Sequence, residues 1–155
     1  MISQIHLLLH NIRSTHNVGA ILRTADATGV SKVYFSGYTP APIDRFGRAR
    51  MDISKASLGA EKTVAWESVE SDVELIKRLK KEKFKIVAVE QDKRSINYKK
   101  ITKNKNILLI LGNEVDGVDK LILDLCDEIV EIPMLGIKES LNVSVTAGII
   151  LYALR

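Results

Sequence analysis

Short apolar runs alternate along this chain with longer segments whose apolar residues recur at helical spacing. The short runs have the length of strands and cover residues 5–11, 32–36, 64–67, 84–89, 106–111 and 128–132. The longer segments predict helices over residues 17–27, 71–82, 121–125 and 140–155. Strands that alternate with helices are typical of an α/β domain with a mainly parallel sheet flanked by helices. We therefore expect one such domain over residues 1–155.

Local signals refine the ends of these elements. Gly29 is well placed to end the first predicted helix, and Ser140 is suited to be the N-cap of the last one. Residues 37–60 have no regular pattern and form the longest predicted loop, which carries Arg45, Arg48 and Arg50. A loop of this length in a compact domain usually binds a ligand or is mobile.

The composition is that of an ordinary globular protein, with 46% hydrophobic and 27% charged residues among 155. No apolar run has the roughly 18 residues that a membrane span needs, and the first residues lack the features of a signal peptide. Cys126 stands alone between apolar and acidic residues, which predicts a buried structural thiol and no intramolecular disulfide. We expect a cytoplasmic protein without a membrane partner.

The net charge of +4 is modest, but the charges are unevenly distributed. Residues 77–105 carry twelve lysines and arginines, whereas residues 114–131 are acidic with Lys120 as the only base. A basic zone can attract a polyanion such as RNA. The same lysines also fit the solvated face of a helix and a loop, so the charge alone leaves both interpretations open.

Three of the segments that follow predicted strands are rich in small and hydrogen-bonding residues. They are residues 11–17, with Gly19 and Arg23 just beyond, residues 112–117 and residues 133–142. Ligands of open parallel sheets bind beyond the carboxyl ends of the strands, where these segments must lie. The sequence therefore predicts a binding site for a small polar ligand at this edge.

Several common kinds of site are excluded by the sequence. It contains neither the glycine pattern of a dinucleotide-binding turn nor that of a P-loop, and it has no G-x-S-x-G elbow for acyl transfer. His6, His10 and His16 lie too close together, without a cysteine or a second group of ligands, to predict zinc. We expect no metal and assign these histidines to the surface or to packing.

Taken in order, the three strand-end segments resemble the three motifs of the TrmH/SpoU family, part of the SPOUT methyltransferase superfamily. The motifs are present as NVGAILRTA at residues 17–25, GNEVDG at residues 112–117 and IPMLGIKESLNVSVTAGIILY at residues 132–152. The stretch SLGAE at residues 57–61 is also similar to the family. Three motifs in order over nearly the whole chain make the resemblance specific.

The resemblance implies that the C-terminal part of the sheet passes through a loop as a deep trefoil knot, and that the cofactor is S-adenosylmethionine. The loops of such a knot form the cofactor pocket. Carried over to this sequence, the cofactor-binding residues are Val89, Glu90, Leu111, Gly112, Asn113, Ile132, Met134, Leu141 and Asn142.

The reaction implied by the resemblance is methylation of a ribose 2′-hydroxyl in tRNA or rRNA. The implied catalytic residues are Asn17, Arg23, Glu114, Ser140 and Asn142. Arg23 would meet the 2′-hydroxyl or a neighbouring phosphate, and we favour electrostatic activation because a guanidinium is an awkward base. Family members are homodimers with composite sites, which would bring Arg23 toward the cofactor.

Larger members of the family carry RNA-binding extensions, and we expect this chain to lack one. The loop that holds Arg45, Arg48 and Arg50 is then the expected RNA-binding surface. Two alternatives stay open beside the 2′-O-methyltransferase. One is an RNA-binding protein that keeps the fold with little activity, and the other is a base methyltransferase of the same superfamily.

Overall fold

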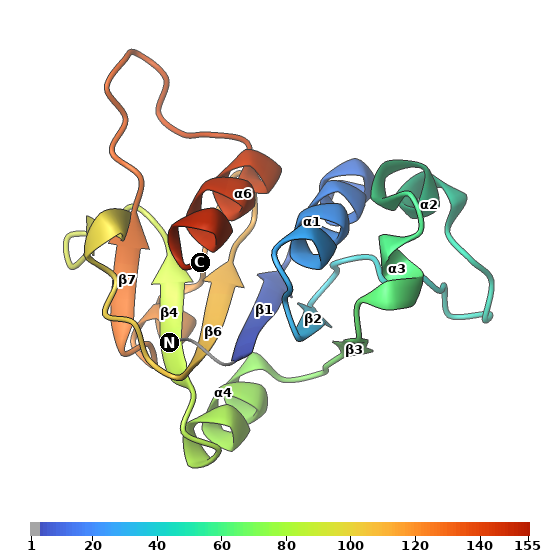
Figure 1. The fold of residues 1–155 in the computed structure, drawn as a ribbon, viewed down its shortest axis with the longest axis horizontal. Helices are drawn as coiled ribbons and strands as arrows, with labels where there is room; N and C mark the ends of the chain where they lie inside the picture. The colour runs from blue at the N-terminus through green and yellow to red at the C-terminus, as the bar shows by residue number, and fades with distance from the viewer. Residues whose placement is uncertain (1–3) are drawn as a thin grey trace.

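Seven strands form one sheet in the order β3-β2-β1-β6-β4-β7-β5 in the computed structural model, which describes residues 4–155 (Figure 1). Their bounds are Gln4–His10 (β1), Lys32–Ser36 (β2), Trp66–Ser68 (β3), Lys85–Val89 (β4), Ile96–Asn97 (β5), Asn106–Leu111 (β6) and Glu128–Glu131 (β7). Each of the neighbouring strands pairs in parallel. The predicted α/β architecture with a mainly parallel sheet is confirmed.

The middle of the sheet is apolar on both faces because helices cover both faces. β6 pairs with β1 on one side and with β4 on the other. Along β1, Leu7 and Leu9 belong to one buried cluster and Leu8 to the cluster on the opposite face. This is the alternation expected when successive side chains point to opposite sides of a strand.

Six α-helices and one 3₁₀ turn complete the described chain. One face of the sheet is covered by α1 (Thr15–Ala27) and α6 (Val143–Ala153), and the short helices α2 (Met51–Ser57) and α3 (Ala60–Thr63) pack beside α1 (Figure 1). The other face is covered by α4 (Asp72–Lys81) and α5 (Lys120–Leu123). The 3₁₀ turn covers Tyr98–Lys100.

Gly19 allows α1 and α2 to approach each other closely. A Cβ atom at this position would lie 2.6 Å from the carbonyl oxygen of Ile53 and 2.6 Å from Cβ of Ala56. These distances are too short for any side chain, so the packing of the two helices requires glycine here. The first motif of the sequence therefore has a structural role besides its proposed chemistry.

The final helix begins later than the sequence predicted. Asn142, and not Ser140, is its N-cap, because the Asn142 Oδ1 atom accepts a hydrogen bond from the backbone N–H of Ser144 at 2.8 Å. The backbone at Ser140 still belongs to the loop that leads into the helix. The expected end of α1 is confirmed, since Gly29 follows its last turn with φ +69°.

Most other elements differ from the predicted ranges by one or two residues, and larger differences lie in three places. Residues 37–60 are not irregular throughout, because they contain α2 and the first residue of α3. The third strand is shifted to Trp66–Ser68, and the two-residue strand β5 was not predicted. Both α2 and β5 are too short for a clear hydrophobic period, and they are held by tertiary packing or sheet pairing.

Three of the twelve cations of the basic zone pair with the acidic segment. Lys85 Nζ lies 2.8 Å from Glu128 Oε2, and Arg94 Nη1 lies 2.8 Å from Asp124 Oδ1. Lys80 approaches Asp127 at 3.5 Å. Part of the positive charge of residues 77–105 is therefore used within the molecule, which weakens this zone as an RNA-binding surface.

Cys126 is half-buried, and its Sγ atom donates to the carbonyl oxygen of Ile122 at 3.2 Å. Burial and then the charge of Asp127 raise the pKa of this thiol to about 12. The prediction of an unreactive structural thiol agrees with this environment. Among the helices described, none is both long and apolar enough to cross a membrane.

Candidate functional site

A pocket of about 480 Å³ opens at the carboxyl edge of the sheet, where β4, β6 and β7 end. The loop from β7 to α6 projects beyond this edge and closes one side of the pocket (Figure 1). Because the strands are parallel, the segments that follow them meet at the same edge. The volume lies within the range that small-molecule sites occupy.

All nine residues predicted to bind a cofactor line this pocket, as do Glu114 and Ser140. Residues that the prediction missed also line it: Gln91, Val115, Gly117, Glu131, Glu139, Val143 and Thr146. Of these, Gln91 is the second residue after the buried strand β4, which is a position that sequence reasoning could have selected. The others depend on how the loops fold over one another.

The charges that surround the pocket are negative. Glu90, Glu114, Glu131 and Glu139 contribute to the lining, and none of the lining residues from the described part of the chain is a lysine or an arginine. A pocket of this kind disfavours a phosphate group and favours a ligand that carries positive charge. Leu111, Ile132 and Leu141 add apolar walls.

The loop after β6 is organised by the side chain of Asn113. The Asn113 Oδ1 atom accepts hydrogen bonds from the backbone N–H groups of Val115 and Asp116 at 2.7 and 2.8 Å. Its Nδ2 atom donates to the carbonyl oxygen of Asn11 at 2.8 Å and to the hydroxyl of Tyr38 at 2.6 Å. The Asn113 amide is thus occupied by the protein, so a ligand would meet the backbone of this loop.

Glu90 ties the end of β4 to the same loop. Its Oε2 atom accepts from the backbone N–H of Val118 at 2.8 Å, and its Oε1 atom accepts from the N–H of Gln91 at 2.8 Å. The Gln91 Nε2 atom donates to the carbonyl oxygen of Glu139 at 2.6 Å, which reaches the β7–α6 loop. The side chains of Glu90 and Gln91 therefore connect the three loops that form the pocket.

Three of the five predicted catalytic residues form a chain of hydrogen bonds. The Asn17 Nδ2 atom donates to Glu114 Oε1 at 3.2 Å, and the Asn142 Nδ2 atom donates to Asn17 Oδ1 at 3.2 Å. Asn17 is 97 residues from Glu114 and 125 residues from Asn142 in sequence. The structure thus brings the three motifs together at the mouth of the pocket. Ser140 is exposed in the loop beside them.

Arg23 lies apart from this group. It is exposed on α1 and lines a separate shallow groove with Ala20 and Thr24 of the same helix, Ala56 of α2 and Tyr152 of α6. It is not among the described residues that line the pocket. Within one chain, Arg23 therefore does not meet the other predicted catalytic residues at the pocket.

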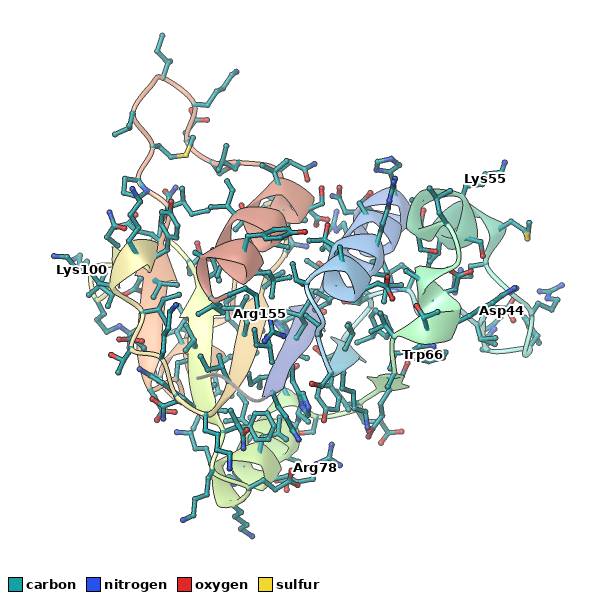
Figure 2. All side chains as sticks on the ribbon, in the orientation of Figure 1. Asp44, Lys55, Trp66, Arg78, Lys100 and Arg155 are labelled. Atoms are coloured by element: carbon teal, nitrogen blue, oxygen red, sulfur yellow. The ribbon has the colours of Figure 1, made fainter. Side chains whose placement is uncertain are left out.

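The three arginines predicted to contact RNA lie beyond α2 and α3. Figure 2 shows Asp44, their neighbour, at the far side of the molecule from the β7–α6 loop. Arg45 and Arg48 are exposed, whereas Arg50 is half-buried and its Nε atom is shielded from solvent. Arg50 therefore offers less of its guanidinium to a ligand than the other two.

His10, at the carboxyl end of β1, is buried between two carboxylates. Its Nδ1 atom lies 3.2 Å from Asp72 Oδ2, and its Nε2 atom lies 3.2 Å from Asp119 Oδ2. Burial disfavours the charged ring, but the hydrogen bonds and charges of Asp72 and Asp119 together outweigh it and raise the pKa of His10 above 6.5. This electrostatic role differs from the surface or packing role that the sequence predicted, and it links β1 to α4 and to the start of α5.

We expect His10→Gln to lower the free energy of unfolding by about 2 kcal/mol near pH 6, because it leaves Asp72 without its cationic partner. Because the pKa of His10 is higher in the folded protein than in the unfolded one, the stabilisation is complete at pH values below the unfolded-state pKa of about 6.5. It is lost as the pH rises through the folded-state pKa. Urea unfolding of wild type and variant between about pH 6 and 9 measures the difference, which should shrink as the pH rises. A constant difference would contradict this account, and His16→Gln, at an exposed position, is the control.

His6 does pack against its neighbours as predicted, with its ring centroid 4.5 Å from that of Phe84. Burial, followed by the charge of Lys32, lowers the pKa of His6 to about 4. Across residues 4–155 no group of three or more histidine, cysteine or acidic side chains is arranged to hold a metal ion.

The sequence matches the SpoU rRNA Methylase family model over residues 4–152. A tRNA (guanosine(18)-2′-O)-methyltransferase of Aquifex aeolicus is 36% identical over 142 residues, which are 92% of this chain and 64% of that protein. A 23S rRNA (guanosine-2′-O-)-methyltransferase of Neisseria meningitidis is 36% identical over 149 residues, which are 96% of this chain and 57% of that protein. The chain thus spans 57% to 64% of the length of these curated relatives.

Solved structures show the same arrangement. The A. aeolicus TrmH/SpoU tRNA modifying enzyme matches with a TM-score of 0.86 and 33% identity, covering 98% of this chain and 74% of that one. An AdoMet-bound rRNA methyltransferase of Sinorhizobium meliloti matches with a TM-score of 0.86 and 27% identity, covering 100% of this chain and 57% of that one. These likenesses cover 98% to 100% of this chain.

Proposed function

Since this chain belongs to the SpoU rRNA Methylase family, we propose that it transfers a methyl group from S-adenosylmethionine to a ribose 2′-hydroxyl in tRNA or rRNA. The observation that carries the proposal is the junction of the three motifs, where Asn17, Glu114 and Asn142 are hydrogen-bonded at the mouth of the pocket. The relatives named as tRNA and rRNA 2′-O-methyltransferases support the same reaction.

The chemistry of the pocket suits S-adenosylmethionine. Four glutamates and no lysine or arginine from the described residues line it, so it favours a sulfonium over a phosphate-bearing nucleotide. Its apolar walls, Leu111, Ile132 and Leu141, match a flat purine ring. Gly112, which also lines the pocket, allows the backbone of this loop to pass close to Gly117. When bound, the cofactor supplies an electrophilic methyl group.

The protein's own part is to position and activate the 2′-hydroxyl, which is a weak nucleophile until its proton is polarised. Asn17 is held between Glu114 and Asn142, so it fixes the orientation of these two side chains, which line the pocket and can position the sugar. Ser140 is exposed beside this group and is free to donate to the ribose or to the cofactor. Arg23 contributes a positive charge that stabilises the oxygen as it loses its proton.

The distance of Arg23 from its own pocket supports a homodimer. We propose that Arg23 of each chain completes the pocket of the other chain, since Arg23 lines a groove on α1 and not the pocket. A two-fold dimer would create two equal sites of this kind.

The strand order supports the deep trefoil knot that the resemblance implies. β6 lies between β1 and β4, although β4 and β5 both precede it in sequence, and the chain then returns to β7 before α6 packs beside α1. We propose that this path passes through the loop after β4, which would fix the pocket loops rigidly. We also propose that the protein acts in the cytoplasm, where its RNA substrates would be found.

Incubation with S-adenosylmethionine labelled in the methyl group and with total RNA tests the function. We expect label in RNA, and we expect nuclease digestion to leave dinucleotides at the labelled site, because a 2′-O-methyl group blocks cleavage of the neighbouring phosphodiester. Label in fully cleaved mononucleotides would instead identify a base methyltransferase. Tight binding of RNA without any transfer of label would identify an RNA-binding protein of the same fold.

A further inference from the structure

A small hairpin at residues 43–49, in the segment between β2 and α2, lies on the opposite side of the molecule from the β7–α6 loop (Figure 1). Ile43 and Ala49 pair as an antiparallel bridge across its base. The Asp44 Oδ1 atom accepts from the backbone N–H groups of Phe46 and Arg48 at 2.8 and 3.0 Å. The hydrogen bond from the N–H of Arg48, and then that from Phe46, lowers the pKa of Asp44, so this carboxylate stays charged and keeps the turn in shape.

Phe46 stands at the tip of this hairpin and exposes 66% of its surface. Its ring is accompanied by two guanidinium groups, with the Cζ atoms of Arg45 and Arg48 at 4.8 and 5.0 Å from the ring centroid. An exposed phenylalanine has no role in the core, and hydrophobic burial does not explain its position. An exposed aromatic ring beside arginines has the chemistry of a stacking surface for nucleobases.

We propose that Phe46 stacks against an unpaired nucleobase of the RNA, while Arg45 contacts an adjacent phosphate. Arg48 is fixed, because its Nε atom donates to Asp44 Oδ2 at 3.1 Å. Arg45 has no such carboxylate partner among the described residues, so its guanidinium is available to an anion. The inference rests on the proposed function for the identity of the ligand, and it adds a second contact with that ligand.

The charge of the hairpin favours RNA over a protein partner. Residues 43–50 contain three arginines and a single aspartate, and that aspartate is already bound by the turn. Asp44 of the hairpin lies on the opposite side of the molecule from the β7–α6 loop (Figure 2), residues of which line the pocket of the same chain. The base that stacks on Phe46 is therefore distinct from a nucleotide held in the pocket of the same chain.

Fluorescence anisotropy with a labelled oligouridylate of about 12 nucleotides, and with an RNA duplex of equal length, tests the proposal. We expect Phe46→Ala to weaken binding of the single strand about 10-fold and binding of the duplex far less. The dependence of binding on salt should stay unchanged, because stacking releases no counterions. Phe46→Trp should restore binding, and its new fluorescence should be quenched by the oligonucleotide.

Arg45→Ala is the matched control, because it removes a charge from the same hairpin. We expect it to reduce the slope of log affinity against log salt by about 0.7, the value for one phosphate contact on a single strand. The proposal is overturned if Phe46→Ala binds the single strand as well as wild type does, if it weakens single strand and duplex equally, or if it dissociates an oligomer on size exclusion. The last result would assign Phe46 to a protein interface.

These outcomes are separate from those of the proposed function, because binding is measured without S-adenosylmethionine. If Phe46→Ala binds the single strand as wild type does, while the wild-type protein methylates RNA, only the stacking contact is overturned. Normal stacking in a protein that transfers no methyl group overturns only the enzymatic proposal.

Discussion

Arg23→Ala should reduce methyl transfer to RNA about 1,000-fold and leave the affinity for S-adenosylmethionine unchanged. The guanidinium lies outside the pocket of its own chain, and in the proposed dimer it faces the ribose at the other pocket, so its removal leaves the residues that hold the cofactor in place. Its effect falls on the transition state, in which the 2′-oxygen gains negative charge. Single-turnover transfer rates and calorimetric titration with S-adenosylmethionine measure the two quantities separately.

Two further variants show whether the loss is specific. Arg23→Lys keeps the charge but loses the planar pair of donors, so we expect it to recover only part of the rate. Arg78→Ala removes another exposed helix arginine, one that approaches Glu67 at 3.7 Å, and should keep wild-type transfer. Retention of the wild-type rate by Arg23→Ala would show that this residue has no part in the chemistry.

Gly112→Ala should weaken binding of S-adenosylmethionine about 100-fold, because the added Cβ atom has no space. That atom would lie 2.5 Å from the carbonyl carbon of Gly117 and 2.6 Å from the backbone nitrogen of Val118. Neither can move without breaking the paired hydrogen bonds between Asn113 and Gly117, at 3.1 and 2.9 Å. The backbone at Gly112 and Gly117, which lines the pocket, would therefore be displaced.

The control for this variant is Gly148→Ala in α6, where the nearest atom to the added Cβ would be Thr24 Cγ2 at 3.9 Å. It should bind the cofactor as wild type does. Thermal unfolding of both variants separates a local change at the pocket from a loss of the fold. Equal affinity of folded Gly112→Ala and wild type would place the cofactor elsewhere.

A mixture of Arg23→Ala and Gly112→Ala tests whether each site is composed of residues from both subunits. If Arg23 of the partner subunit completes each pocket, a mixed dimer has one pocket with an intact floor and an intact arginine opposite it. Random mixing of the two proteins should then restore about a quarter of the wild-type activity. If Arg23 served its own chain, the mixture would stay inactive.

The sequence predicted the sheet well where burial leaves a strong pattern. β2 and β6 were predicted with the bounds that the structure has, because apolar strands buried on both faces stand out from their flanks. α2 could not be predicted in this way. Only two of its seven residues are buried, and the close approach that Gly19 permits holds it against α1.

The pocket lining was predicted from the resemblance, whereas its internal geometry was not. The bond between Asn17 and Glu114 joins residues 97 positions apart, and no local pattern encodes it. Asn142 replaced Ser140 as the helix cap because the pocket loop continues to that point. The sequence analysis also missed the pairing of His10 with Asp72 and Asp119, because both partners are distant from His10 in the sequence.

Every step of this account requires that the acidic pocket at the carboxyl edge holds a sulfonium compound. Isothermal titration of the purified protein with S-adenosylmethionine tests this directly. We predict saturable binding at one site per chain, weakened about 100-fold in Gly112→Ala and kept in Arg23→Ala. Absence of any binding by wild type, even with RNA present, would contradict the account.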